Sequence, residues 1–154
     1  MNLNWHYASW NELNRDDLYD LLKLRINVFV VEQNCPYPEC DDKDQKSGHL
    51  WARNEQGVMV ACLRIVQPGV SYAQVSIGRV ATAAEVRGAG CGRELMKRGI
   101  EKIQDLYGQV EIKISAQLYL EKFYSDFGFR SVGEPYPEDD IPHIAMIRPA
   151  TAYL

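Results

Sequence analysis

Three glycines at alternate positions, in the stretch RGAGCG (87–92), stand between an apolar β-branched run and an amphipathic helical pattern. Backbone N–H groups at the start of a helix have no partner inside the helix, and the helix dipole favours an anion beside them. Glycines let an anion approach the backbone without meeting a Cβ atom. The order of strand, glycine turn and helix therefore predicts a site that binds a phosphate group. It also requires the chain to pass from a strand directly into a helix at this point.

Two common nucleotide-binding loops do not fit this stretch. A P-loop requires Lys and then Ser or Thr after its last glycine, whereas Arg93 and Glu94 follow Gly92. A dinucleotide fingerprint that started at Gly88 would require its third glycine where Arg93 stands. A turn without a ligand is disfavoured, because three glycines weaken the start of a helix and their presence there needs a reason.

The apolar periodicity on both sides of the glycines predicts an α/β domain. We expect strands over 3–10, 49–54, 58–66, 74–82, 110–116 and 143–148, and helices over 14–31, from the glycines to Tyr107, and over 118–127. The short turns between the three middle strands predict an antiparallel meander. The segments 34–48 and 134–142 are expected to be loops. The resulting order, β-α-loop-β-β-β-α-β-α-β, predicts a mixed central sheet of six to seven strands flanked by helices, in one domain over 1–154.

Length, net charge and the distribution of apolar residues disfavour several classes of protein. The chain has 154 residues, a net charge of −4 and a pI of about 5.4, which disfavours general binding to nucleic acid or to anionic membranes. The N-terminus lacks a basic segment followed by an apolar run, and the apolar runs are too short to span a bilayer. We therefore expect a cytoplasmic protein whose four cysteines are reduced.

A metal or redox role for the cysteines is an alternative. Cys35, Cys40 and His49 have the spacing C-x4-C-x8-H, but structural zinc sites are usually tighter and paired, so we expect no metal. Cys91 lies at the predicted helix start, where a thiol pKa can be lowered, which would suit a thiol switch. A small residue tolerated in a backbone-binding loop is the favoured interpretation of Cys91.

The motifs together resemble the GCN5-related N-acetyltransferases. The pattern R-G-x-G-x-G after a strand is similar to their motif A, which holds the pyrophosphate of acetyl-CoA, and FYSDFGF (123–129) resembles their second signature. The order of elements also matches that fold over nearly the whole chain. RINVFVVEQNCPY (25–37) and IPHIAM (141–146) are similar to the ElaA-type bacterial branch of the family.

This resemblance implies a site for acetyl-CoA. The implied pyrophosphate loop comprises Arg87, Gly88, Ala89, Gly90, Cys91 and Gly92, with Arg93 following it. Val80, Ala81 and Thr82 would lie along the pantetheine arm, on a bulged strand that diverges from its neighbour and can pair with the cofactor like an added strand. Gln117 stands where many relatives have a CoA-binding Asn.

The resemblance also implies catalytic roles. Tyr124 corresponds to the tyrosine that protonates the departing thiolate, and Tyr119 is a weaker candidate. A base must deprotonate the acceptor, and the candidates are His143, Glu32, Glu138, His49 or a chain of waters. Glu32 and Gln33 are expected to shape the acceptor pocket, with His49 and Glu138 as further acceptor contacts. The acidic stretches 40–44 and 137–140 are expected to attract a cationic amine.

The predicted activity is therefore acetyl-CoA-dependent N-acyl transfer, directly and without an acyl-enzyme, to a primary amine of a small molecule or peptide. A non-catalytic acyl-CoA sensor is the alternative, because it would keep the glycine loop and lose the acid and the base. The acceptor and the choice between monomer and homodimer stay open.

Overall fold

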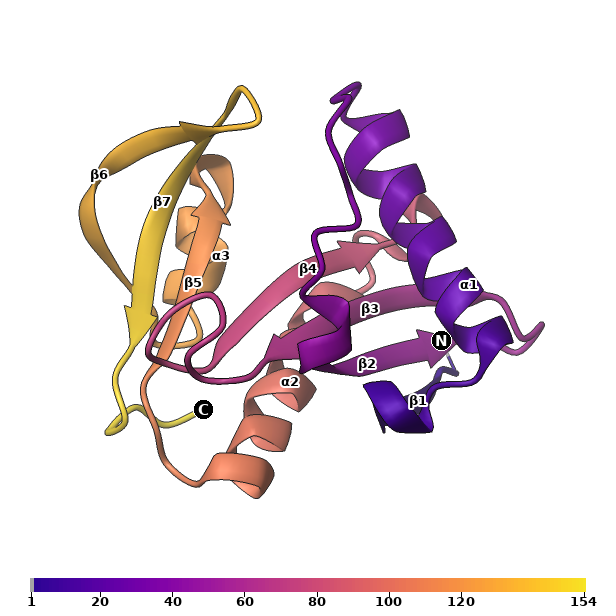
Figure 1. The fold of residues 1–154 in the computed structure, drawn as a ribbon, viewed down its shortest axis with the longest axis horizontal. Helices are drawn as coiled ribbons and strands as arrows, with labels where there is room; N and C mark the ends of the chain where they lie inside the picture. The colour runs from indigo at the N-terminus through magenta and orange to yellow at the C-terminus, as the bar shows by residue number, and fades with distance from the viewer. Residues whose placement is uncertain (1) are drawn as a thin grey trace.

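The computed structural model describes residues 2–154 (Figure 1). Seven strands follow in chain order: β1 (Asn4–Ser9), β2 (Ser47–Arg53), β3 (Met59–Val66), β4 (Ser76–Thr82), β5 (Ile112–Gln117), β6 (Arg130–Glu138) and β7 (Ile141–Arg148). The helices are α1 (Arg15–Arg25), α2 (Cys91–Tyr107) and α3 (Glu121–Ser125), with the short helices η1 (Trp10–Glu12), η2 (Ile26–Glu32), η3 (Asp44–Lys46), η4 (Ala84–Val86) and η5 (Leu118–Leu120).

The strands form two antiparallel sheets, which Figure 1 shows on either side of a gap. The first sheet has the order β1-β2-β3-β4, and its last three strands are the predicted meander. The second has the order β5-β7-β6. One parallel bridge, between Val75 and Ile112, joins β4 to β5 and gives the combined sheet its mixed direction. The predicted α/β fold is thus confirmed.

Helices cover both faces of the first sheet. Successive strand side chains point to opposite faces, so Leu50 packs in the cluster that includes α2, whereas Trp51 packs in the cluster that includes α1. The apolar face of α2 is fully buried at Leu95, Met96 and Ile100. This burial holds α2, and the glycine turn before it, against the sheet.

The first helix begins where the sequence predicts and ends in an unusual form. Asn14 caps α1, because its Oδ1 accepts a hydrogen bond of 2.8 Å from the backbone N–H of Asp17. The last turns, η2, are a π-helix over Ile26–Glu32. Such wide turns are rare and are frequent at functional sites.

One predicted loop is wrong in part. Residues 134–138 belong to β6, which pairs with β7, and only Asp139 and Asp140 form the turn, both at positive φ. The strand is at the edge of its sheet and mostly exposed, so it lacks apolar alternation. An edge strand also tolerates the prolines at 135 and 137 that make the sequence look like a loop.

Candidate active site

A cavity of about 930 Å³ lies where β4 and β5 diverge. Within residues 2–154, backbone pairing between them is confined to the bridge between Val75, just before β4, and Ile112, where Lys113 N also donates to Val75 O at 3.1 Å. Beyond it, the walls come from β4, β5, the π-helix η2, the loop after it, the region of η5 and α3, and the β6–β7 turn. The cavity therefore runs between the two sheets.

A β-bulge shapes the β4 wall. Cys62 pairs with Ala81 and Arg64 with Gly78, so Arg79 and Val80 both lie opposite Leu63. Arg79 has a φ of 50°, the left-handed conformation common in bulges. A bulge leaves backbone groups unpaired, and the predicted pantetheine-contacting residues Val80, Ala81 and Thr82 all line the cavity. The bulge and the diverging strands that the resemblance implied are both present.

The glycine turn leads from the end of β4 into α2. Gly90 is the N-cap of α2 with a φ of 80°, and Gly88 has a φ of 84°. The first backbone hydrogen bond of α2 runs from Glu94 N to Gly90 O at 3.1 Å. The backbone N–H groups of 88–93 have no hydrogen-bond acceptor within residues 2–154. A Cβ atom on either glycine would meet no protein atom within 4 Å. The positive φ values therefore favour glycine at both positions. The space beside both glycines is free of protein atoms, so an anion can approach the backbone there.

The charged side chains beside the turn are paired. Arg87 donates to Thr82 O at 2.6 Å and to Glu32 Oε2 at 2.8 Å, and both charged residues line the cavity. Glu32 therefore lies beside the glycine turn, on the wall of the same cavity. Arg93 bonds Asp126 at 2.9 Å, and its guanidinium lies over the Phe123 ring.

Tyr124 lies on the cavity wall from α3, with only 7% of its surface exposed. Its ring makes edge contacts with Phe123 and Phe129, and its backbone carbonyl accepts from Phe127 N at 3.0 Å. Burial raises the pKa of Tyr124 well above its ordinary value, so the hydroxyl keeps its proton at neutral pH, as a general acid requires. Tyr119 also lines the cavity but is exposed.

His143 faces the same cavity from β7. Its Nδ1 lies 2.7 Å from Ile141 O, and because a carbonyl only accepts, Nδ1 carries the hydrogen. That leaves Nε2 to take up a proton, 3.3 Å from Glu138 Oε2. The Glu138 carboxylate can stabilise the resulting imidazolium. Ser115 bonds Glu138 at 3.4 Å and also contacts the hydroxyl of Tyr136, whose ring stacks on His143.

Gln33 and Gln117 connect η2 to the end of β5. Gln33 Nε2 donates to Gln117 Oε1 at 3.2 Å, and Gln117 Nε2 donates back to Gln33 Oε1 at 3.3 Å. Both residues line the cavity. Their paired amides bridge its two sides, so the predicted CoA contact of Gln117 and the predicted acceptor contact of Gln33 fall at one place.

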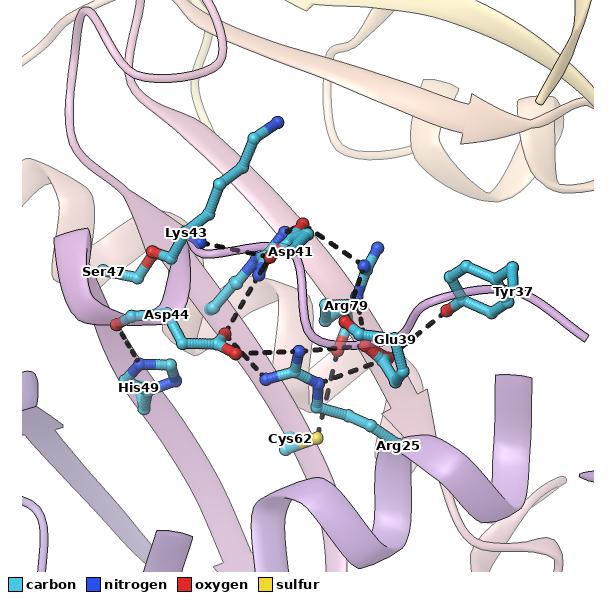
Figure 2. Close-up of polar contacts among 11 residues, drawn as sticks. Arg25, Tyr37, Glu39, Asp41, Lys43, Asp44, Ser47, His49, Cys62 and Arg79 are labelled. Atoms are coloured by element: carbon cyan, nitrogen blue, oxygen red, sulfur yellow. Dashed lines mark hydrogen bonds and ion pairs between the residues drawn. The ribbon is translucent and has the colours of Figure 1, made fainter. Parts of the chain in front are cut away.

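A buried ion-pair network that was not predicted from the sequence is shown in Figure 2, and its members Asp41, Arg64 and Arg79 line the cavity. Three arginines and three carboxylates form it: Arg25, Arg64, Arg79, Glu39, Asp41 and Asp44. Arg25 bonds Glu39 at 3.0 Å and Asp44 at 2.8 Å. The network attaches the loop after η2 to α1, β3 and β4. Its signal in the sequence is an arginine inside each of three apolar runs, LKLRINVF, ACLRIV and SIGRVA, because a buried arginine needs partners.

The network corrects the role expected for the acidic stretch 40–44. Arg64 bonds Asp41 at 2.5 Å and Asp44 at 3.0 Å, and Arg79 bonds Asp41 at 3.3 Å. Burial alone would raise the pKa of both carboxyl groups, but the arginine hydrogen bonds and charges outweigh it and hold each pKa below its usual range. Two of these acids are thus already neutralised by arginines and are not free to attract an amine.

We expect the free energy of unfolding to fall as the pH drops below about 4, the unfolded pKa of Asp. A carboxyl whose folded pKa is lowered stabilises the fold above its unfolded pKa, and this is lost as the pH falls towards the folded pKa. Urea denaturation at pH 7, 4 and 3 measures the loss. Asp41→Asn should reduce the pH dependence, whereas Asp42→Asn should not, because Asp42 is exposed and has no ion pair with any of residues 2–154. Equal pH profiles for all three proteins would contradict this account of Asp41.

His49 and the cysteines lie apart from this chemistry. His49 is 1% exposed, bonds Asp44 O at 3.0 Å and does not line the cavity, so the structure does not support its predicted acceptor contact. Among residues 2–154, no three His, Cys, Asp or Glu side chains are arranged to hold a metal, so Cys35, Cys40 and His49 do not converge. Burial and Glu94 raise the pKa of Cys91, the opposite of the lowering that a thiol switch at a helix start would need.

With this geometry established, comparison with known proteins identifies the family. The acetyltransferase (GNAT) domain family matches residues 24–148, and the chain belongs to it. The chain is 39% identical to Protein ElaA of Escherichia coli over 150 residues, 95% of this chain and 96% of that protein. It is 40% identical to a UPF0039 protein of Synechocystis sp. over 147 residues, 96% of each.

Solved structures agree with this placement. An acyl-CoA N-acyltransferase from Pseudomonas aeruginosa is 42% identical with a TM-score of 0.91, covering 96% of this chain and 99% of that one. Escherichia coli ElaA is 37% identical with a TM-score of 0.89 and the same coverage. The resemblance to the ElaA-type branch is confirmed, and acyl-CoA-dependent N-acyl transfer is the general activity that the family supports. No helix within residues 2–154 is long and apolar enough to cross a membrane.

Proposed function

We propose that this protein is a cytoplasmic enzyme that transfers the acetyl group of acetyl-CoA directly to a primary amine of a small molecule or peptide. One observation carries the proposal: Arg87 and Gly92 of the glycine turn, the bulged edge of β4, Tyr124 and His143 all face one cavity. A donor that bound the glycine turn and followed β4 would reach the two residues suited to proton transfer.

The glycine turn and the cavity wall each suit one part of acetyl-CoA, and the turn reaches the cavity at Arg87 and Gly92. The N–H groups of 88–93, at the positive end of the 17-residue helix α2, suit the pyrophosphate. The edge of β4 over Val80–Thr82 faces the gap to β5 and suits the pantetheine arm, which can pair with it like an added strand. An unpaired N–H at the bulge suits the thioester oxygen as negative charge develops on it.

The transfer uses two proton movements. The amine attacks the thioester carbon, a C–N bond forms and the C–S bond breaks. His143 Nε2 takes the proton that the amine loses, and Glu138 stabilises the charged ring. Tyr124 gives its proton to the departing thiolate. No acyl-enzyme is required, and the buried Cys62 and Cys91 have thiol pKa values that burial raises, to about 12 for Cys62, which makes both poor nucleophiles.

Tyr124→Phe should lower kcat about a hundredfold and leave the KM for acetyl-CoA nearly unchanged, because it removes only the proton. A screen of primary amines with acetyl-CoA, followed by thiol release, measures this in the wild type and the variant. Tyr119→Phe is the matched control, since Tyr119 lines the same cavity but is exposed, and should keep full activity.

Three outcomes would count against the proposal. Acetyl-CoA binding without turnover of any amine would favour the sensor. Equal kcat values for the wild type and Tyr124→Phe would remove Tyr124 from the chemistry. An acetylated protein that forms with acetyl-CoA alone and then passes its acetyl group to an amine, seen by intact mass, would exclude direct transfer.

A further inference from the structure

The cavity has walls of opposite charge. One wall belongs to the β6–β7 turn and carries Glu138 and Asp139 beside His143. The other belongs to β3, β4 and the loop before β2, and carries Lys43 with the network arginines Arg64 and Arg79. These walls come from the two separate sheets, on opposite sides of the gap in Figure 1.

Lys43 leaves the second wall with an uncompensated positive charge. In the network three arginines meet three carboxylates, so no network acid is left to balance Lys43, and the neighbouring Asp42 is exposed and does not line the cavity. Its side chain is half-buried and has no ion-pair partner among residues 2–154. Its backbone is fixed, because Lys43 N donates to Asp41 Oδ1 at 3.2 Å and Lys43 O accepts from Ser47 Oγ at 2.7 Å.

Arg79 adds a second donor on the same wall. Its Nε and Nη2 are held by Glu39 at 2.8 Å and by Asp41 at 3.3 Å, and its guanidinium lies over the Tyr37 ring. No hydrogen bond is recorded for its Nη1 within residues 2–154. In Figure 2 the ammonium of Lys43 and the outer nitrogen of Arg79 extend to the same side, away from the carboxylates. A guanidinium fixed in this way loses little entropy when it binds a ligand.

The position of Lys43 separates it from the pyrophosphate loop. Lys46 O accepts from Gln67 N at 3.2 Å, which places the segment 43–46 at the end of β3. The register pairs Val66 with Ser76, the first residue of β4, whereas the glycine turn follows Thr82 at the other end. A strand of this length spans about 20 Å. Lys43 is therefore at the far end of β4 from the predicted pyrophosphate site.

We propose that the acceptor carries an anionic group, a carboxylate or a phosphate, in addition to its amine. Lys43 and Arg79 bind the anion, and the wall with Glu138 and His143 receives the amine. The inference rests on the proposed function and names the class of its acceptor. A purely cationic amine, such as a polyamine, would gain nothing from Lys43 and would be repelled by it.

Matched acceptors test this proposal. The common L-amino acids are compared with their primary amides, and 2-aminoethyl phosphate with ethanolamine, using acetyl-CoA and thiol release. In at least one pair the anionic member should have a kcat/KM at least tenfold higher, and the pair that shows it identifies carboxylate or phosphate. Lys43→Met should remove most of this preference by raising KM. Lys46→Met, at an exposed lysine that does not line the cavity, should leave it unchanged.

Calorimetry with CoA-saturated protein separates this inference from the proposed function. If no amine is acetylated, yet anionic members bind and Lys43→Met weakens that binding severalfold, the anion site stands and the proposed function fails. If neutral amines are acetylated as well as their anionic partners in every pair, or Lys43→Met leaves the preference intact, the anion site is overturned and the proposed function stands. Absence of both turnover and binding of anionic members overturns the anion site as well.

Discussion

Gly90→Val is expected to lower the affinity for acetyl-CoA at least a hundredfold, about 2.7 kcal/mol of binding free energy. Gly90 has a φ of 80°, which a β-branched residue adopts only with strain. If the backbone holds this conformation, the side chain enters open space beside the predicted pyrophosphate, because a Cβ there meets no protein atom within 4 Å. If the backbone relaxes, the N–H groups turn away from the anion. Calorimetric titration with acetyl-CoA measures the loss.

Gly57→Val is the matched control. Gly57 has a φ of 79° and equally open surroundings, but it lies in the turn between β2 and β3. The two substitutions should therefore lower Tm similarly through strain, and only Gly90→Val should weaken acetyl-CoA binding. Wild-type affinity in Gly90→Val, or an equal loss of affinity in Gly57→Val, would show that the glycine turn does not hold the pyrophosphate.

The glycine turn could be predicted because its physics is local. A left-handed N-cap, free N–H groups and the amphipathic α2 all follow from residues close together in the sequence. The meander of β2, β3 and β4 was equally accessible, since short turns force neighbouring strands to pair antiparallel. The position of Tyr124 on the cavity wall came from the resemblance carried by FYSDFGF, not from its spacing.

Features that depend on distant partners were not predictable. Pro135 and Pro137 made β6 look like a loop, because proline is disfavoured inside a sheet, although β7 follows β6 directly after the turn at Asp139 and Asp140. Asp41 and Asp44 were expected to attract an amine, because their arginine partners lie 19 or more positions away in the sequence. Which acid pairs with each buried arginine is determined only by the folded structure. The absence of a paired acid for Lys43 is therefore also a property of the fold.

Arg25→Met should reduce the free energy of unfolding by about 3–5 kcal/mol, the cost of removing one partner from a buried ion pair. Arg25 is 1% exposed and bonds Glu39 and Asp44, which are 5% and 6% exposed, so two carboxylates would lose their shared cation. Methionine fills similar volume, so the loss reports charge rather than a cavity. Arg79 and Arg64 would still pair with these acids, but two arginines would then face three carboxylates. Urea denaturation at pH 7 measures the loss, and the difference from wild type should shrink as the pH falls, because protonation removes the excess negative charge.

Arg53→Met is the control for this effect. Arg53 also pairs with two carboxylates, Asp17 at 2.6 Å and Asp20 at 2.9 Å, but its side chain is 19% exposed and theirs are 23% and 36% exposed. Its loss should therefore cost only about 1 kcal/mol, as for exposed pairs. Adding Glu39→Gln to Arg25→Met should recover part of the stability, since two arginines then face two carboxylates and the excess negative charge is removed. Equal losses for Arg25→Met and Arg53→Met, or no recovery in the double variant, would mean that packing rather than paired charge attaches this loop to the sheet.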